Sequence, residues 1–237
     1  MKRSVLLAVL ALLLACACLA SAEPEKINLI MIGGDGDLIE SSNNIFRNIL
    51  LSHEELQDRM EAFFVRSVKG RYDNATAIKQ KNEMLGYISP DRRNIVAGFS
   101  HGGQSVYFLE TDHVSDIFLM DACVSIGGKC AEPVSCGKVW AQWIIDTAKK
   151  GIDLHIFASR GKHNEPSGAK NAIVNLEKIA EEDNSVEALE AGLYRVLDES
   201  GNELARIEAS ILEINHREIC PAVQELAERF ILALPEE

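Results

Sequence analysis

Short apolar runs alternate with amphipathic helical patterns along most of this 237-residue sequence, and that alternation constrains the fold more than any other feature. We expect strands at residues 27–32, 63–68, 94–99, 116–120, 152–158, 193–197 and 204–214. Helical patterns cover residues 42–51, 53–61, 74–88, 101–110, 138–150, 167–182 and 221–234. Because strands that run parallel need crossover helices, the alternation predicts one α/β domain over residues 23–237. Its sheet should be mostly parallel, with helices on both faces.

The first 22 residues have the pattern of an export signal. Lys2 and Arg3 precede an apolar run that is short for a membrane span, and small residues end the segment at Ala22. We therefore predict cleavage after Ala22, a secreted or periplasmic protein, and no integral span in the mature chain. A second interpretation is a lipid anchor on Cys16, because the four residues that end there loosely resemble a bacterial lipobox.

The net charge of the sequence limits the kinds of partner that we expect it to bind. A formal net charge of -12 repels nucleic acid and anionic membrane surfaces, so neither is expected to bind.

Four cysteines remain after the signal: Cys123, Cys130 and Cys136 close together, and Cys220 far downstream. An even number in an exported protein favours disulfides, and one bridge would tie the cysteine loop to the C-terminal segment, although the pairing stays open. No paired Cys-x-x-Cys spacing points to zinc, and we expect no metal.

The clearest chemical motif surrounds Ser100. Gly98 and Gly102 flank it at two residues on either side, an apolar strand precedes it and a helical pattern follows it. A sharp strand-to-helix turn strains the serine backbone and leaves no room for bulky side chains at the two glycine positions. Such a turn exposes the hydroxyl beside the backbone N–H of His101, which is placed to stabilise an oxyanion. An idle serine in a glycine-rich turn is the competing interpretation.

The run from Asn94 to Gly103, Asn-Ile-Val-Ala-Gly-Phe-Ser-His-Gly-Gly, resembles the nucleophile elbow of the α/β-hydrolase superfamily. The order of elements across nearly the whole mature chain is similar as well. The resemblance implies a Ser-acid-His triad, an oxyanion hole and no cofactor. The family histidine follows the last strand, where this sequence has His216, and His163 is the rival base.

The acid has two candidates. Asp121 comes directly after the expected strand 116–120, and Glu165 comes late in the loop after the next strand. Members of the superfamily carry the acid at either place, and we favour Asp121. In the same resemblance the loop after the first strand supplies an oxyanion donor, so Gly34 or Asp35 would give the second hydrogen bond. Unlike many relatives, this chain has no histidine before those glycines, and that leaves the donor open.

These residues together predict a serine hydrolase that forms an acyl-enzyme. The short connection after the fourth expected strand leaves little room for a large lid, and an open cleft suits a carboxylic ester, either a small molecule or a lipid. We rank lipid esters, thioesters and amides behind other carboxylic esters. The alternative is a binding or interaction protein that keeps the scaffold without catalysis, since a fold alone does not establish activity.

Overall fold

The computed structural model describes residues 26–33, 44–66, 73–109, 111–122, 133–160 and 168–235, with backbone only at 133–136 and 168. Several expectations lie outside these residues. They are the export signal, the lipid anchor on Cys16, the oxyanion residues Gly34 and Asp35, the rival groups His163 and Glu165, and the loop cysteines Cys123 and Cys130.

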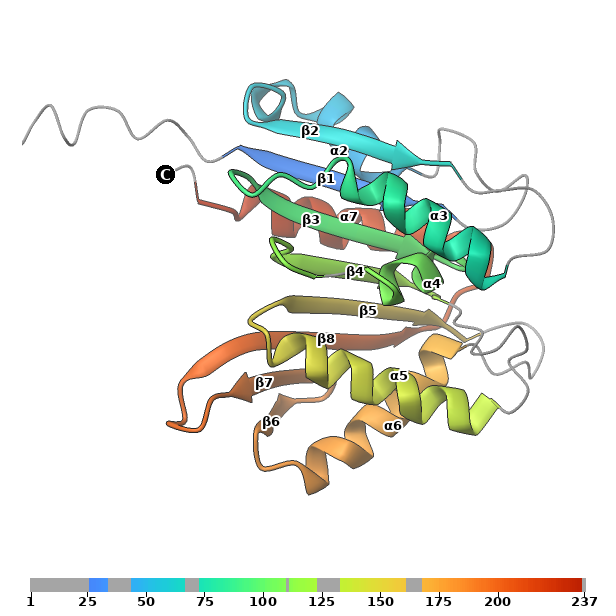
Figure 1. The fold of residues 1–237 in the computed structure, drawn as a ribbon, viewed down its shortest axis with the longest axis vertical. Coiled ribbons are helices and arrows are strands. Elements are labelled where there is room, and N and C mark those ends of the chain that lie inside the picture. The colour runs from blue at the N-terminus through green and yellow to red at the C-terminus, as the bar shows by residue number, and fades with distance from the viewer. Residues whose placement is uncertain are drawn as a thin grey trace, which may run out of the picture.

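One open sheet organises the described chain (Figure 1). Its strands in chain order are β1 (Ile27–Ile32), β2 (Met60–Val65), β3 (Arg93–Phe99), β4 (Asp116–Met120), β5 (Asp153–Ser159), β6 (Val186–Glu190), β7 (Leu193–Leu197) and β8 (Glu203–Leu212). Their order in space is β2-β1-β3-β4-β5-β8-β7-β6. The pairings from β2 to β8 are parallel, and β7 pairs antiparallel with both β8 and β6. The prediction of a single-domain, mostly parallel α/β fold is confirmed.

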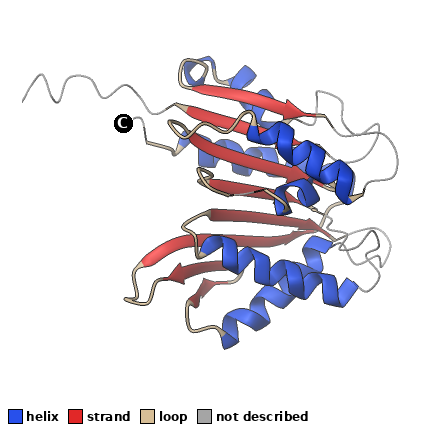
Figure 2. Cartoon of the chain, viewed as in Figure 1, coloured by secondary structure: helices blue, strands red, loops and turns tan. Residues whose placement is uncertain are grey.

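Helices cover both faces of the sheet, as the parallel connections require (Figure 2). In the view of Figure 1, four helices lie in front: α3 (Asn74–Leu85), α4 (Gly102–Tyr107), α5 (Pro133–Ala148) and α6 (Gly168–Glu182). Behind the sheet lie α2 (Ile45–Ser52) and α7 (Ile219–Leu232). Two apolar cores follow from this arrangement, one on each face.

Strand β1, next to the edge strand β2, divides its side chains between these cores. Ile30 and Ile32 belong to the core under α3 to α6, whereas Leu29 and Met31 belong to the core under α2 and α7. Successive residues of a strand point to opposite faces, so a strand covered on both sides is mostly apolar. All six residues of β1 are buried and five of them are apolar, while the sixth, Asn28, donates hydrogen bonds to Tyr87 O and Asn94 Oδ1.

The structure corrects the region after α2. The predicted helix over 53–61 is absent, and only a short 3-10 turn, Glu54–Leu56, forms before β2 begins at Met60. The turn is fixed by Leu56, which is buried, and by His53, whose ring contacts Glu228 of α7 at 2.6 Å. These contacts outweigh the helical pattern, because the chain must reverse here to enter the edge strand.

Two other differences concern boundaries and one missed strand. The helix predicted from residue 138 begins at Pro133, and the helix predicted over 101–110 is shorter, Gly102–Tyr107. The edge strand β6 was not expected. No helix in the described part of the chain is both long and apolar enough to cross a bilayer.

Candidate active site

Ser100 occupies a strained turn between β3 and α4. Its φ angle is 53°, in the left-handed region that residues other than glycine seldom adopt, and the residue is 8 % exposed. Gly102 lies so close to the end of β1 that a Cβ there would be 2.6 Å from the carbonyl oxygen of Ile32. A Cβ at Gly98 would likewise lie only 2.8 Å from a methyl group of Val106. The glycines are therefore required by close approach, and the turn holds a non-glycine residue in a conformation typical of functional sites.

His216 connects Ser100 to Asp121. Its Nε2 lies 3.1 Å from Ser100 Oγ, and its Nδ1 lies 2.6 Å from Asp121 Oδ2. Both distances are within hydrogen-bond range. Since an ionised carboxylate only accepts, Nδ1 carries the proton, and Nε2 is left to accept from the serine hydroxyl. Serine, imidazole and carboxylate thus form one chain of hydrogen bonds.

The three side chains come from distant parts of the sequence and meet at one edge of the sheet. Ser100 follows β3, Asp121 follows β4, and His216 follows β8 in a one-turn 3-10 helix, His216–Glu218. Strand β8 lies three spacings from β3, about 14 Å. The four residue-to-residue steps from Leu212 to His216 can span about that distance when extended. This is the carboxyl edge, where ligands of open α/β sheets bind.

Backbone hydrogen bonds tie the strand ends together along this edge. Ser100 N–H donates to Met120 O at 3.0 Å, and Asp121 N–H donates to Phe157 O at 2.6 Å. Arg160 N–H donates to the last residue of β8 at 3.0 Å. Asp121 has the same left-handed turn as Ser100, with φ 44°. The serine and the acid are therefore held one strand apart by the sheet itself.

Two residues that the sequence did not single out complete the site. Phe99, at the end of β3, stacks on the His216 ring with centroids 4.9 Å apart. Ser159, at the end of β5, donates its hydroxyl to Asp121 Oδ2 and its backbone N–H to Oδ1 at 3.2 Å. The signal for Phe99 was its place next to the serine, and the signal for Ser159 was its place at the carboxyl end of a strand.

Burial and hydrogen bonding oppose each other at Asp121, which is 3 % exposed. Burial raises the pKa of its carboxyl, but hydrogen bonds from His216 and Ser159 outweigh burial, so the pKa lies below the usual value. The acid is therefore ionised at neutral pH. Cys220, at the start of α7, is also buried, and burial together with the charge of Asp121 raises the pKa of its thiol to about 12.

The structure describes some of the remaining predicted residues and does not describe others. His101 lies half-buried at the head of α4, next to Ser100. Cys220 carries a free thiol, which gives no support to the predicted bridge between the cysteine loop and the C-terminal segment. The side chains of the other three mature cysteines are not described, and disulfide formation stays a prediction. The choice of Asp121 agrees with its contact to His216, and the catalytic roles of all three residues stay predictions.

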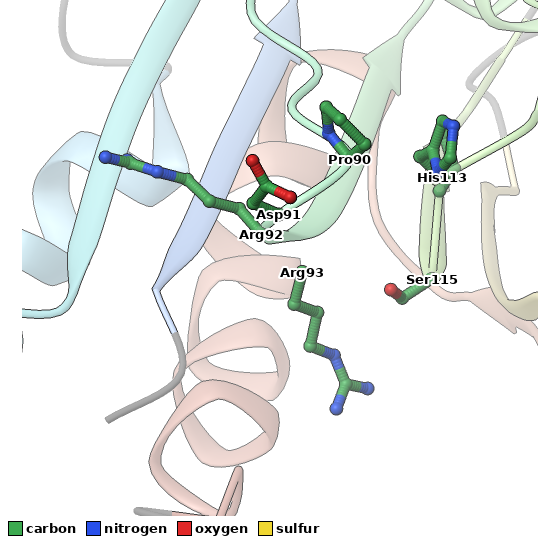
Figure 3. Close-up of a pocket in the computed structure, with 7 residues that line it drawn as sticks. Pro90, Asp91, Arg92, Arg93, His113 and Ser115 are labelled. Carbon is green, nitrogen blue, oxygen red and sulfur yellow. The ribbon is translucent and has the colours of Figure 1, made fainter. Parts of the chain in front are cut away.

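A hollow of about 410 Å³ lies away from these residues, where β3 and β4 begin (Figure 3). Its lining includes Arg92 and Arg93. Arg92 bonds to Glu61 at 3.0 Å, and Arg93 bonds to the buried carboxylate of Asp116 at 3.0 Å. Both cations are neutralised by neighbouring acids, and the hollow is at the opposite edge of the sheet from Ser100.

The fold and these contacts define an α/β protein with a Ser-His-Asp cluster at the carboxyl edge of a mostly parallel sheet. This layout is compatible with that of the α/β-hydrolases. A comparison with protein-family models finds no match, and a comparison with curated proteins finds no significant relative.

Proposed function

We propose that the protein is a serine hydrolase of the α/β-hydrolase type that cleaves carboxylic esters. The observation that carries the proposal is the pair of contacts made by His216, 3.1 Å to Ser100 and 2.6 Å to Asp121. A serine hydroxyl is a weak nucleophile unless a base accepts its proton, and an oriented imidazole is the usual base. The proposal includes export of the chain with cleavage after Ala22.

In the first half of the reaction, Ser100 Oγ attacks the ester carbonyl carbon while its proton moves to His216 Nε2. The carboxylate of Asp121 holds the protonated ring and stabilises its charge. The tetrahedral oxyanion is expected to accept from the backbone N–H of His101, with the second donor from Gly34 or Asp35. When the carbon–oxygen bond of the leaving group breaks, His216 returns the proton to the departing alcohol.

The second half uses the same groups on water. His216 Nε2 removes a proton from a water molecule, and the resulting hydroxide attacks the acyl-enzyme carbonyl. Collapse of this second intermediate breaks the bond to Ser100 Oγ, which recovers its proton, and the carboxylic acid leaves. No other group has to change its oxidation or protonation state.

Access to the reacting atoms supports a substrate that arrives from solvent. The His216 side chain is 39 % exposed, although Ser100 and Asp121 are almost covered. An ester can therefore approach over the imidazole, and its alcohol group can leave by the same route. A short-chain p-nitrophenyl ester is a suitable first substrate because it needs little acyl pocket.

The first test is covalent labelling with a fluorophosphonate probe, which reacts with an activated serine. We expect the wild type to be labelled and to hydrolyse p-nitrophenyl acetate, whereas Ser100→Ala loses both properties. The loss in kcat should be about 10³-fold or more, because the nucleophile itself is removed.

Ser185→Ala is the matched control, since Ser185 lies between α6 and β6 and takes no part in the cluster. It should label at the wild-type rate. A wild type that resists the probe as fully as Ser100→Ala, under conditions in which both are folded by circular dichroism, would refute the proposed function.

A further inference from the structure

Ser159 has contacts that the reaction above does not use. It is the last residue of β5, its side chain is 2 % exposed, and it touches the proposed acid rather than the nucleophile. Its hydroxyl donates to Asp121 Oδ2, and its backbone N–H donates to Asp121 Oδ1 at 3.2 Å. One residue therefore holds both oxygens of the carboxylate and fixes the plane of that group.

The oxygen that receives the Ser159 hydroxyl is also the oxygen that receives the His216 ring. His216 Nδ1 lies 2.6 Å from Asp121 Oδ2, so two donors share one acceptor atom. A donor that acts on this atom changes how strongly the carboxylate attracts the imidazole. The backbone bond to Oδ1 also lowers the pKa of the carboxyl, but only the hydroxyl shares the oxygen that His216 contacts.

The backbone of Ser159 is rigid. It pairs with Leu212 in the parallel register of β5 and β8, and the next N–H, from Arg160, donates to Leu212 O at 3.0 Å. The pairing of β5 with β8 thus holds the backbone of Ser159 in place. Both of its donors contact Asp121 in this arrangement.

We propose that Ser159 is a positioning residue of the hydrolase, which orients Asp121 toward His216 and moderates the pull of the carboxylate on the imidazole. This inference rests on the proposed function. The hydroxyl and the backbone N–H of Ser159 both donate to Asp121, so we place its effect on the reaction through that carboxylate.

The consequence for pH follows from the charge of the carboxylate. A neutral hydroxyl that donates to Asp121 stabilises its ionised form. Without that donor the Asp121–His216 pair binds a proton more tightly, and it takes up this proton at a higher pH. Other titratable side chains around the pair are Cys220, whose thiol stays neutral, and Arg160 and Glu213, which pair with each other at the surface.

The test is Ser159→Ala, assayed with p-nitrophenyl acetate across pH 5–9. We expect kcat to fall about tenfold, because the base loses part of its orientation but keeps the backbone bond to Oδ1. The KM should not change. The acidic limb of the kcat/KM profile should move upward by about one pH unit, the size expected for one hydrogen bond to a charged group.

Ser159→Thr and Ser159→Val separate the hydroxyl from the packing. They add the same volume at the same place, and only the threonine keeps the donor. The threonine variant should have the wild-type acidic limb, and the valine variant should have the limb of Ser159→Ala. This pair also keeps the inference testable where the alanine variant does not fold.

Ser185→Ala is a closely matched control away from the site. Ser185 donates its hydroxyl to Asp183 Oδ1 at 2.6 Å and its backbone N–H to the same oxygen at 2.9 Å. Ser185→Ala therefore removes a hydroxyl hydrogen bond to a carboxylate, as Ser159→Ala does. Its kcat and acidic limb should equal those of the wild type.

A second readout needs no turnover. In nuclear magnetic resonance the His216 ring signals of the free protein should titrate at a higher pH in Ser159→Ala than in the wild type. An inert wild type refutes the proposed function and leaves this measurement to decide whether Ser159 governs the pair. An active wild type whose acidic limb and ring titration are both unchanged in Ser159→Ala overturns the inference.

Discussion

The hydrogen bonds that Asp121 makes in the folded state affect both the pKa of its carboxyl and the stability of the fold. Burial alone would raise its pKa, yet hydrogen bonds from His216 and Ser159 lower it below the usual value of 3.8. A carboxyl whose pKa is lower in the folded than in the unfolded state stabilises the fold above the unfolded value. That stabilisation is lost as the pH falls through the lower, folded value. The contacts that orient Asp121 toward His216 therefore also favour the native state at neutral pH.

Replacing this carboxyl by an amide should separate the two effects. In Asp121→Asn the side-chain amide can donate toward His216 Nδ1 and so favour the tautomer whose Nε2 carries a proton. That tautomer cannot accept from Ser100, and we expect kcat for p-nitrophenyl acetate to fall by about 10²–10⁴-fold. Steady-state kinetics at pH 7 measure the loss, and circular dichroism checks the fold.

The rival acid supplies the control for this prediction. Glu165→Gln changes the other carboxylate that the sequence offered, and its kcat should stay near the wild-type value. The reverse pattern, with a silent Asp121→Asn and a severe Glu165→Gln, would move the acid to residue 165.

At this scale the sequence was informative where a residue type and its place in the chain agree. Ser100 could be chosen because glycines flank it after a strand, and Asp121 because it follows a strand directly. His216 could be chosen because the resemblance implies a histidine after the last strand. Ser159 could not be chosen in this way, since a serine at a strand end is common and its partner depends on which strands are neighbours. The stacking of Phe99 on His216 likewise depends on a contact between residues more than a hundred positions apart.

At the scale of elements, the first turn of α4 packs very closely against the ends of the strands. Gly102 faces the end of β1, and Gly103 lies so near Ala122 that a Cβ there would be 2.4 Å from the alanine Cβ. The helix carries few residues, so its position depends on these approaches and on its hydrogen bond from Gly103 N–H to Ser100 O at 3.1 Å. The turn that holds Ser100 is thus built from backbone packing.

A methyl group at Gly102 should disturb that packing. It would meet the carbonyl oxygens of Ile32 at 2.6 Å and Gly33 at 2.7 Å, and neither can move without distorting β1. We expect Gly102→Ala to lower the free energy of unfolding by about 1–3 kcal/mol, the usual cost of overpacking, and to reduce probe labelling. Urea denaturation followed by circular dichroism measures the first effect.

Gly86→Ala provides the comparison. Gly86 ends α3 on the surface, and its φ of -68° suits any residue. The free energy of unfolding of Gly86→Ala should equal that of the wild type, or exceed it by less than about 1 kcal/mol. Equal destabilisation by the two substitutions would show that the approach to β1 is not what demands glycine at position 102.

The elements themselves were predictable where burial enforces a period. Strands such as β1 and β4 are apolar because both faces are covered, and their boundaries agree closely with the sequence pattern. The edge strand β6 has one buried residue, Val186, followed by four exposed ones, so it carries no such pattern. The segment 53–61 has a helical pattern, but tertiary contacts of His53 and Leu56 decide its conformation.

At the scale of the whole molecule, the candidate site depends on the entire parallel sheet. The residues at its centre are separated by up to 116 positions, from Ser100 to His216. They meet only when β3, β4, β5 and β8 are all in register, and those strands contribute to both apolar cores. The site should therefore form and disappear together with the global fold.

Urea provides a direct test of this dependence. The fraction of protein labelled by the fluorophosphonate and the far-UV circular dichroism should decrease with the same midpoint, because no smaller part of the fold can assemble the cluster. Loss of labelling at clearly lower urea would contradict the prediction. It would show that the segment with His216 opens locally while the sheet persists.

The hydrogen bonds that join one strand end to the next along the carboxyl edge have a consequence for how such a protein can diversify. Ser100, Asp121 and Arg160 each attach their backbone to the neighbouring strand, so the spacing of the reactive groups is set below the loops that follow them. In the proposed hydrolase, insertions and replacements in those loops can then alter which ester is accepted while the positions of Ser100 and Asp121 stay the same. An engineer can therefore keep the strand ends unchanged and vary one loop at a time to change the specificity.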